Sequence, residues 1–342
     1  MKILLVSPSS DILGFIGDWT ESALKTLNCE VKRFDYRASR LGVFGKFRNH
    51  SSFIKEHVIK RMNSDLIKEV VAYRPEMVLV IFGEGISGNT LVEIRKKNVL
   101  LVNWFHDSIV MDIRLKFLKE FPKYYDFFLI IDSKEALKKV QIDCKNVELL
   151  SLACDENIHK KIELAQDERT IYSSDLTFFG TVVPHRAAVL ETVADLNLSI
   201  WGPQKNIYGC WPEKYPGLAH CYKGRALHDP LEIVKVNNAS KILINTHGLS
   251  GDKLYSLPSR IFETAGCGAF QITEYSDILA EHFNIGKEIV CYKKPEELRE
   301  LAKYYLSSDK EREAIANAGQ IRAYRDHTFI KRMRELLEKI KR

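Results

Sequence analysis

Residues 258–270, PSRIFETAGCGAF, place two charged side chains where a helix is expected to begin. Arg260 falls in the first turn, and Glu263 follows three residues later on the same face. A cation is disfavoured there, because a helix N-terminus carries about +0.5 of an elementary charge. An anion held by the arginine and the free N–H groups would remove this conflict. The pattern therefore indicates a phosphate or diphosphate site, with a carboxylate nearby that could accept hydrogen bonds from a ribose diol. The alternative is a surface Arg–Glu pair on a helix whose small residues serve packing.

A second polar motif, WFHDS at 104–108, directly follows an apolar run that is expected to be a strand. Asp107 could act as a general base towards an acceptor hydroxyl, or could orient that hydroxyl, and His106 could contact a sugar. The alternative is structural, because Asp107 or Ser108 would serve well as the N-cap of the next helix.

The stretch GEGISG at 83–88 matches the dinucleotide-binding pattern GxGxxG after an expected strand. It favours a competing function, that of an NAD(P)-dependent enzyme. Three features weigh against it. The pattern follows a middle strand rather than the first, Glu84 would face an incoming pyrophosphate, and the next helix is short.

Short apolar runs alternate with helical segments along both halves of the chain, which is typical of parallel sheets covered on both faces. The expected strands are 2–7, 29–34, 77–82, 99–105, 126–132 and 146–150, then 175–180, 198–202, 241–247, 269–273 and 288–292. We expect an α/β protein with two Rossmann-like, doubly wound domains facing a central cleft, where ligands bind beyond the carboxyl ends of the strands. The expected parts are an N-terminal domain 1–153, a linker 154–174, a C-terminal domain 175–320, and a C-terminal helix 321–342 that could pack back on the N-terminal domain.

The formal net charge of +6 has its origin in residues 32–61, which hold nine basic and two acidic side chains. Such a segment can attract phosphates or an anionic membrane surface, and the alternative is a solvated face. No known nucleic-acid motif accompanies it, so no nucleic acid is expected as a partner.

No apolar run reaches the roughly 18 residues of a membrane span, so we expect a cytoplasmic protein with room for peripheral contact at the inner membrane face.

Cysteine and histidine patterns give no sign of a metal site. The seven cysteines include no CxxC pair, and the ten histidines show no HExxH spacing. We therefore expect no protein-held metal and no cofactor.

Several motifs together resemble those of a known group of enzymes. They are FFGTVVPHRAAVLE (178–191), IWGP (200–203), LINTHG (243–248), SLPSRIFETAGCGAFQIT (256–273) and EREAIANAGQIRAYRDHTF (311–329). The segment 241–327 resembles the C-terminal domain of GT-B glycosyltransferases, and more closely the CgeB-like bacterial group. VNWFHDS (102–108) and LLSLACDENIH (149–159) fit the same group, so the resemblance covers nearly the whole chain.

The resemblance implies a donor site in the second domain. Arg260, with Ser259 beside it, would hold the diphosphate of a nucleoside-diphosphate sugar, and Glu263 would bind the ribose hydroxyls. The further donor-binding positions that it implies are Gly180, Thr181, Asn245, His247 and Lys253. Related enzymes also bring glycine backbone near the phosphates in the first strand–helix loop. That loop would be DILGFIGD (11–18) here, with Gly14, Gly17 and Asp18, and Asp18 could equally be an N-cap.

The implied activity is sugar transfer from the nucleotide sugar to a glycan, a lipid-linked sugar or a protein, with retention of configuration and without a metal. One position departs from the pattern, since related retaining enzymes carry a Glu eight residues before the ribose-binding one, where this chain has Tyr255. Besides the NAD(P)-dependent enzyme, a third class stays open: a non-catalytic sugar- or nucleic-acid-binding protein on the same fold.

Overall fold

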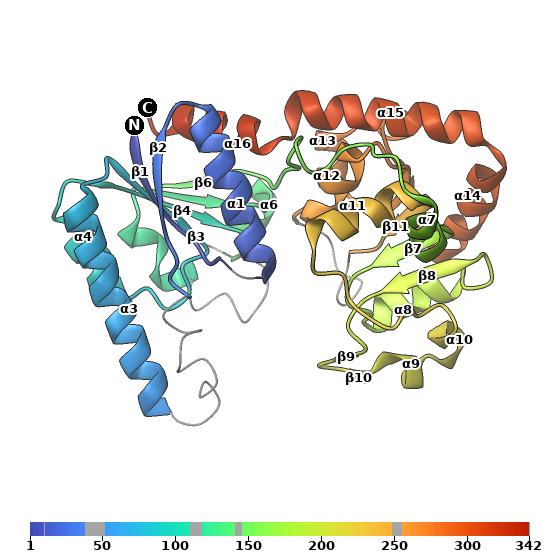
Figure 1. Ribbon diagram of the computed structural model, residues 1–342, viewed down its shortest axis with the longest axis horizontal. Helices are drawn as coiled ribbons and strands as arrows, with labels where there is room; N and C mark the ends of the chain where they lie inside the picture. The colour runs from blue at the N-terminus through green and yellow to red at the C-terminus, as the bar shows by residue number, and fades with distance from the viewer. Residues whose placement is uncertain (10, 38–51, 110–117, 141–145, 248–254, 342) are drawn as a thin grey trace. The chain divides into compact units, whose positions relative to one another are not determined.

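The computed structural model describes residues 1–9, 11–37, 52–109, 118–140, 146–247 and 255–341. The chain divides into two compact units. The first unit comprises Met1–Leu152 together with Phe329–Arg342, and the second comprises Ala153–Thr328. Figure 1 shows a twisted sheet with surrounding helices in each unit.

The first unit contains a six-stranded parallel sheet in the order β2-β1-β3-β4-β5-β6. The strands are β1 (Lys2–Val6), β2 (Glu30–Phe34), β3 (Met77–Ile81), β4 (Leu100–Phe105), β5 (Phe127–Ile130) and β6 (Val147–Leu149). All five residues of β3 are buried, as expected for a central strand with helices on both faces.

The helices of the first unit come from both ends of the chain. They are α1 (Asp11–Thr26), α3 (Ser52–Tyr73), α4 (Gly88–Arg95), η2 (Pro122–Tyr124), α6 (Lys134–Val140) and α16 (Phe329–Lys339). Trp19 of α1 packs on Phe329 of α16 with ring centroids 5.4 Å apart, and Phe329 also lies 6.0 Å from the ring of Trp104 in β4. The last helix therefore belongs to the core of the first unit.

The second unit contains a five-stranded parallel sheet in the order β13-β12-β11-β7-β8. Its strands are β7 (Ser174–Phe179), β8 (Leu198–Trp201), β11 (Ser240–Asn245), β12 (Gln271–Glu274) and β13 (Val290–Tyr292), and β9 (Lys205–Asn206) pairs with β10 (Gly209–Cys210) in a separate hairpin. The helices are α7 (Gln166–Tyr172), α8 (Pro184–Glu191), α9 (Trp211–Lys214), α10 (Pro216–Ala219), α11 (Pro230–Ala239), α12 (Ser259–Gly266), α13 (Asp277–His282), α14 (Pro295–Ser307) and α15 (Asp309–Asp326). Two doubly wound, Rossmann-like units are thus present, as the sequence predicts.

The structure departs from the expected linker 154–174. Cys154 donates its backbone N–H to the carbonyl of His327 at 2.9 Å, and Asn238 of α11 binds the backbone of Lys160 and Ile162. The segment is therefore packed into the second unit, and its last part forms α7. The sequence pattern missed this because the segment is polar and contributes only single buried side chains.

No helix in the described ranges has both the length and the apolar character needed to cross a bilayer.

Candidate functional site

The second sheet changes direction of winding between β7 and β11. From β7 the chain moves outward to β8, and it then returns to β11 on the other side. In doubly wound folds, the carboxyl ends of the strands that flank this switch point form the ligand-binding crevice. Here the connection after β7 leads through Gly180 and Thr181 to α8, and the connection after β11 leads through His247 to α12.

Arg260 lies in the first turn of α12 and reaches back to the end of β7. Its Nη1 donates to the carbonyl of Phe179, and its Cζ lies 5.5 Å from the ring centroids of both Phe178 and Phe179. Its Nε is buried and has no hydrogen-bond partner within the described ranges. The pKa of Arg260 is lowered to about 9. Burial is the main cause, the positive charge of Arg186 acts in the same direction, and the negative charge of Glu263 opposes the shift.

Arg186 is a second cation at the same place, in the first turn of α8. It donates to the carbonyl of Thr181 at 2.9 Å and to that of His247 at 3.3 Å, and its Cζ lies 6.0 Å from the ring of Phe178. Burial also lowers the pKa of Arg186, while the negative charge of Glu274 opposes this shift. Within the described ranges, neither guanidinium forms an ion pair with a carboxylate. Two neighbouring cations that no described carboxylate contacts directly make a site that favours a bound anion.

The helices that carry the two arginines leave their first N–H groups available. The N-cap residues are Val183 for α8 and Pro258 for α12, and neither supplies a side-chain acceptor. A helix N-terminus without a side-chain cap can donate its free N–H groups to a bound anion. The two helix starts and the two arginines thus point to one diphosphate-sized anionic ligand.

Glu263 is buried one turn beyond Arg260, with only 8% of its surface exposed. Burial raises the pKa of Glu263 to about 7, while a hydrogen bond from Ser259 and the charge of Arg260 act in the opposite direction. Within the described ranges no ion pair joins Arg260 to Glu263, so the surface-pair alternative does not describe this helix. A carboxylate with unused acceptor capacity beside an anion site can accept hydrogen bonds from a diol.

His247, at the end of β11, is buried, and neither of its ring nitrogens has a hydrogen-bond partner among the described residues. Burial holds its pKa well below the ordinary range, and the neighbouring cations Arg260 and Arg186 add to this effect. The imidazole is therefore neutral at pH 7, with one donor and one acceptor free for a ligand.

Glu274, at the end of β12, fixes the loop that carries His247. One carboxylate oxygen accepts from the backbone N–H of His247 at 2.9 Å and from Thr246 Oγ1 at 3.1 Å. The other oxygen contacts Nε2 of His185 at 3.1 Å, and His185 precedes Arg186 in α8. Glu274 therefore joins the two connections of the switch point.

Two further residues were predicted to contact the donor, Asn245 and Lys253. Asn245 is 1% exposed, and its Nδ2 donates to Gln271 Oε1 at 2.6 Å, while Gln271 donates to the carbonyl of Ile261. This buried chain of hydrogen bonds holds α12 on the sheet, and Oδ1 of Asn245 has no hydrogen-bond partner among the described residues. Lys253 lies outside the described residues.

The small residues of α12 serve packing rather than a ligand. A Cβ on Gly266 would lie 3.0 Å from Cβ of Cys154, and Gln320 of α15 donates to the carbonyl of Gly266. Ser259 stays at the helix start, beside the candidate site.

In the first unit, His106 and Asp107 follow β4 at the carboxyl edge, as expected. His106 is buried with its ring edge-on to Trp104 at a centroid distance of 4.3 Å, and in the described part of the chain neither ring nitrogen has a hydrogen-bond partner. Burial lowers its pKa to about 3, so it is neutral at pH 7. Asp132, after β5, accepts hydrogen bonds from Ser108 Oγ at 2.6 Å and from the N–H of Ile109 at 3.0 Å. It fixes the loop that presents Asp107, and burial raises its pKa to about 6, with the charge of Asp107 contributing. The helix that Asp107 or Ser108 was expected to cap falls largely on 110–117, outside the described residues.

The expected glycine loop 11–18 is wrong, because α1 already begins at Asp11 and includes Gly14, Gly17 and Asp18. A Cβ on Gly17 would lie 2.5 Å from Arg33 Nη2, so this glycine gives room to the arginine. Asp18 is paired with Arg33 and is not an N-cap. The segment is helical because its apolar residues follow helical spacing on both sides of the two glycines.

The GEGISG loop is occupied by contacts within its own unit. Asn63 donates to the carbonyl of Gly85 at 2.8 Å and accepts from the N–H of Ser87 at 2.9 Å. Ser87 caps α4 through its own hydroxyl, and a Cβ on Gly88 would lie 2.7 Å from the ring of Tyr124. These contacts argue against a pyrophosphate on this loop.

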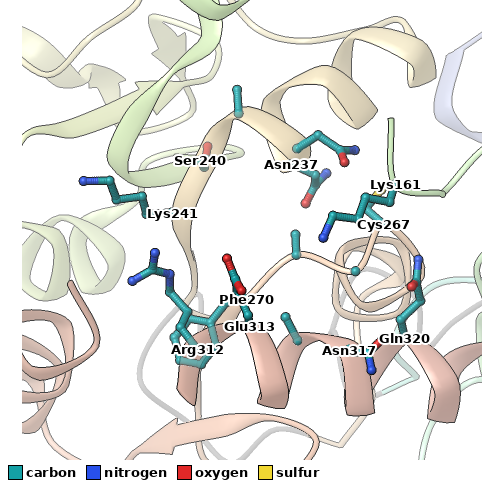
Figure 2. A pocket seen from close by; sticks show the side chains of 15 residues that line it. Lys161, Asn237, Ser240, Lys241, Cys267, Phe270, Arg312, Glu313, Asn317 and Gln320 are labelled. Atoms are coloured by element: carbon teal, nitrogen blue, oxygen red, sulfur yellow. The ribbon is translucent and has the colours of Figure 1, made fainter. Parts of the chain in front are cut away.

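A cavity of about 260 Å³ lies at the opposite, amino-terminal edge of the second sheet. Figure 2 shows Lys161 and Gln320 on one side of it and Lys241 and Arg312 on the other. Lys241 is paired with Asp175 at 2.7 Å and Arg312 with Asp309 at 2.7 Å. Because its charges are largely balanced, this cavity is not the anion site.

Comparison with known proteins gives the fold a name. A family model described as glycosyl transferase-like matches residues 186–338. A sucrose-phosphate synthase from Thermosynechococcus elongatus has 11% identity and a TM-score of 0.72, with 99% of each chain covered. HepE from Anabaena, solved in complex with UDP-glucose, has 12% identity and a TM-score of 0.70, with 100% of this chain and 99% of that chain covered. The chain has the GT-B fold.

A glycosyltransferase from Rickettsia africae shares the GT-B fold, with 13% identity, a TM-score of 0.70, and coverage of 99% of this chain and 97% of that one. A search of curated proteins gave no significant match. The family match and the GT-B fold together support a glycosyltransferase.

Sequence reasoning missed Arg186, Glu274 and Asp132. Arg186 carries the same signal as Arg260, a cation in the first turn of a helix that follows a strand, and could have been found by it. Glu274 and Asp132 lie at or just after strand ends, but only the tertiary structure brings them to the loops that they hold.

Among the described residues, no group of three or more His, Cys, Asp or Glu side chains is placed to bind a metal.

Proposed function

We propose that this chain transfers a sugar from a nucleoside-diphosphate sugar to an acceptor, with Arg186 and Arg260 binding the diphosphate. One observation carries the proposal: at the switch point of a GT-B domain, two neighbouring, partly buried guanidinium groups form no ion pair with any described carboxylate. The proposal further places the chain in the CgeB-like group, on the motifs that surround Arg260.

The two arginines supply what the bond cleavage needs. When the bond between the sugar and the phosphate breaks, negative charge builds up on the departing diphosphate. Fixed cations and helix N–H groups stabilise that charge without reorganisation, so the proposed reaction needs no metal ion. Glu263 accepts hydrogen bonds from the ribose, and neutral His247 contacts the phosphate or the sugar.

We propose retention of configuration, with the departing phosphate accepting the proton of the acceptor hydroxyl. Asp107, on its loop held by Asp132, would then position the acceptor, and His106 would contact the sugar. The acceptor classes that fit this chemistry are a glycan, a lipid-linked sugar and a protein. The basic segment 32–61 is proposed to attract anionic acceptors or an anionic membrane. Its residues Arg40, Lys46 and Arg48 lie in 38–51, outside the described residues.

A thermal-shift screen tests the donor class first. A ligand that binds only the folded state raises the melting temperature, by an amount that grows with its concentration relative to Kd. We expect UDP and UDP-glucose, the ligands named with the HepE structures, to raise it more than uridine or inorganic phosphate do. A shift with NAD and none with any nucleoside diphosphate would reject the proposal.

Chelation tests the metal-free mechanism. We expect release of UDP from the donor to continue at an unchanged rate in EDTA. Loss of turnover in EDTA with recovery on adding manganese would reject the proposed electrostatics.

A further inference from the structure

The hairpin formed by β9 and β10 carries an apolar tip that nothing in its own unit covers. Ile207 and Tyr208 form the two-residue turn, with 91% and 39% of their surfaces exposed. Ile207 is the most exposed large hydrophobic side chain in the described part of the chain. Two-residue hairpin turns normally contain Asn, Asp or Gly. Here two large, largely apolar side chains stand in place of these small or polar ones at an exposed turn.

The hairpin is held in a defined conformation. Asn206 accepts from the N–H of Tyr208 at 2.8 Å, and its Nδ2 donates to the carbonyl of Val182 at 2.6 Å. At the base, Trp211 is 1% exposed and donates from Nε1 to the carbonyl of Pro203 at 3.0 Å. The hairpin is therefore a defined feature of the surface, and Figure 1 shows its two strands beside α9 and α10.

The segment that contains the tip is basic. Lys205 in β9, Lys214 in α9 and Lys223 in the following loop are all exposed, and none of these three pairs with a carboxylate among the described residues. Glu213 is the one acidic residue between Lys205 and Lys223. Three exposed lysines in the segment that carries the apolar tip complement a surface that is anionic outside and apolar beneath.

We propose that this hairpin docks the protein on an anionic lipid bilayer, with Ile207 inserted among the acyl chains and Tyr208 at the headgroup level. Tyrosine is enriched at this depth of a membrane, and Lys205, beside the turn, would contact acidic headgroups together with the other lysines of this segment. A second protein is a poorer fit, because a stable protein interface needs about 800 Å² from each partner and two side chains supply well under that area.

The position of the hairpin gives the docking a consequence. Through Asn206 it is tied to Val182, next to Thr181 of the candidate donor site. If the proposed function holds, the donor site lies near the bilayer, and a lipid-linked acceptor becomes the favoured class. The docking itself does not depend on the proposed function.

Co-flotation with vesicles tests the docking without any nucleotide. Vesicles of equal parts phosphatidylglycerol and phosphatidylcholine are compared with vesicles of phosphatidylcholine alone. We expect the full-length protein to float with the acidic vesicles, and Ile207→Ser with Tyr208→Ser to lower the bound fraction by about tenfold or more, from the lost apolar burial. Lys205→Glu with Lys214→Glu should lower it as well, and high salt should weaken binding of the unmodified protein.

Two exposed isoleucines elsewhere in the same unit provide the control. Ile171 and Ile321 are exposed by 52% and 58% on helices α7 and α15, so Ile171→Ser with Ile321→Ser removes similar apolar surface elsewhere and should bind vesicles normally. Equal flotation of the tip variant and the unmodified protein would overturn the proposal. So would a dimer in sedimentation that the tip variant abolishes, which would assign the tip to a second copy. Unchanged UDP affinity in the tip variant keeps this result separate from the proposed function.

Discussion

The guanidinium of Arg260 fills the space beside Gly180 that a side chain would need. A Cβ built on Gly180 would lie 2.5 Å from Nη1 of Arg260, and the φ angle of Gly180 is +144°. The end of β7 thus lacks a side chain where the cation from α12 reaches across the switch point. The missing side chain at Gly180, after β7, therefore leaves room for the positive charge that Arg260 brings from α12.

The first prediction follows from that contact. Gly180→Ala should displace Arg260 and lower UDP affinity by about tenfold or more, a loss of at least about 1.4 kcal/mol. Gly209→Ala is the matched control, because Gly209 has a φ of +103° but no atom within 4 Å of its Cβ position. Both variants strain the backbone, so the difference between them isolates the crowding of Arg260. Calorimetric titration with UDP measures it, and equal affinities in both variants would disprove the contact's role.

Glu263 should make the stability of the ligand-free protein depend on pH. Burial raises its pKa to about 7 from 4.5, so the folded state holds this proton more tightly than the unfolded chain. The free energy of unfolding therefore falls as pH rises between these two values. Glu263→Gln removes the charge, so it should raise the melting temperature by a few degrees at pH 8 and leave it nearly unchanged at pH 5. Melting curves of both proteins across this range provide the measurement.

The same substitution separates a binding role from a structural one. A ribose diol bound to Glu263 implies that Glu263→Gln weakens UDP by about 1.5–3 kcal/mol, the usual worth of a hydrogen bond to a charged group. Higher stability at pH 8 together with weaker binding would mean that the buried carboxylate serves the ligand. Unchanged UDP affinity would leave it without that role.

Asp107→Asn tests the proposed acceptor side. If Asp107 is a general base, kcat measured as UDP release should fall about 100-fold or more. If it only positions the acceptor, Asn keeps most hydrogen bonds and kcat should fall far less, with a larger change in acceptor KM. Asp132→Asn is the companion variant, because Asp132 holds the loop through Ser108 and Ile109. Full activity in both variants would remove this loop from the mechanism.

Periodicity predicted the sheets of both units well because their strands are short apolar runs between helices. The Ile–Tyr hairpin and the packed segment 154–174 escaped prediction, since each depends on a few long-range contacts such as Asn206 with Val182. The conflict between Arg260 and the helix field correctly marked the place of an unpaired cation. The glycines at 14 and 17 misled, because a glycine that gives room to Arg33 inside a helix looks like a loop glycine in the sequence.

The most direct test of the central claim is calorimetric titration of UDP into Arg260→Ala, Arg186→Ala and Arg299→Ala. Arg299 is an arginine of the same unit that is already paired with Asp195 at 2.5 Å, so it is the matched control. We predict that each of the first two substitutions weakens UDP by about 1.5–3 kcal/mol while leaving the melting temperature unchanged or slightly higher, because each removes a desolvated charge. Arg299→Ala should bind UDP normally. UDP affinity that is the same in all three variants and the unmodified protein would contradict the diphosphate site and, with it, the proposed function.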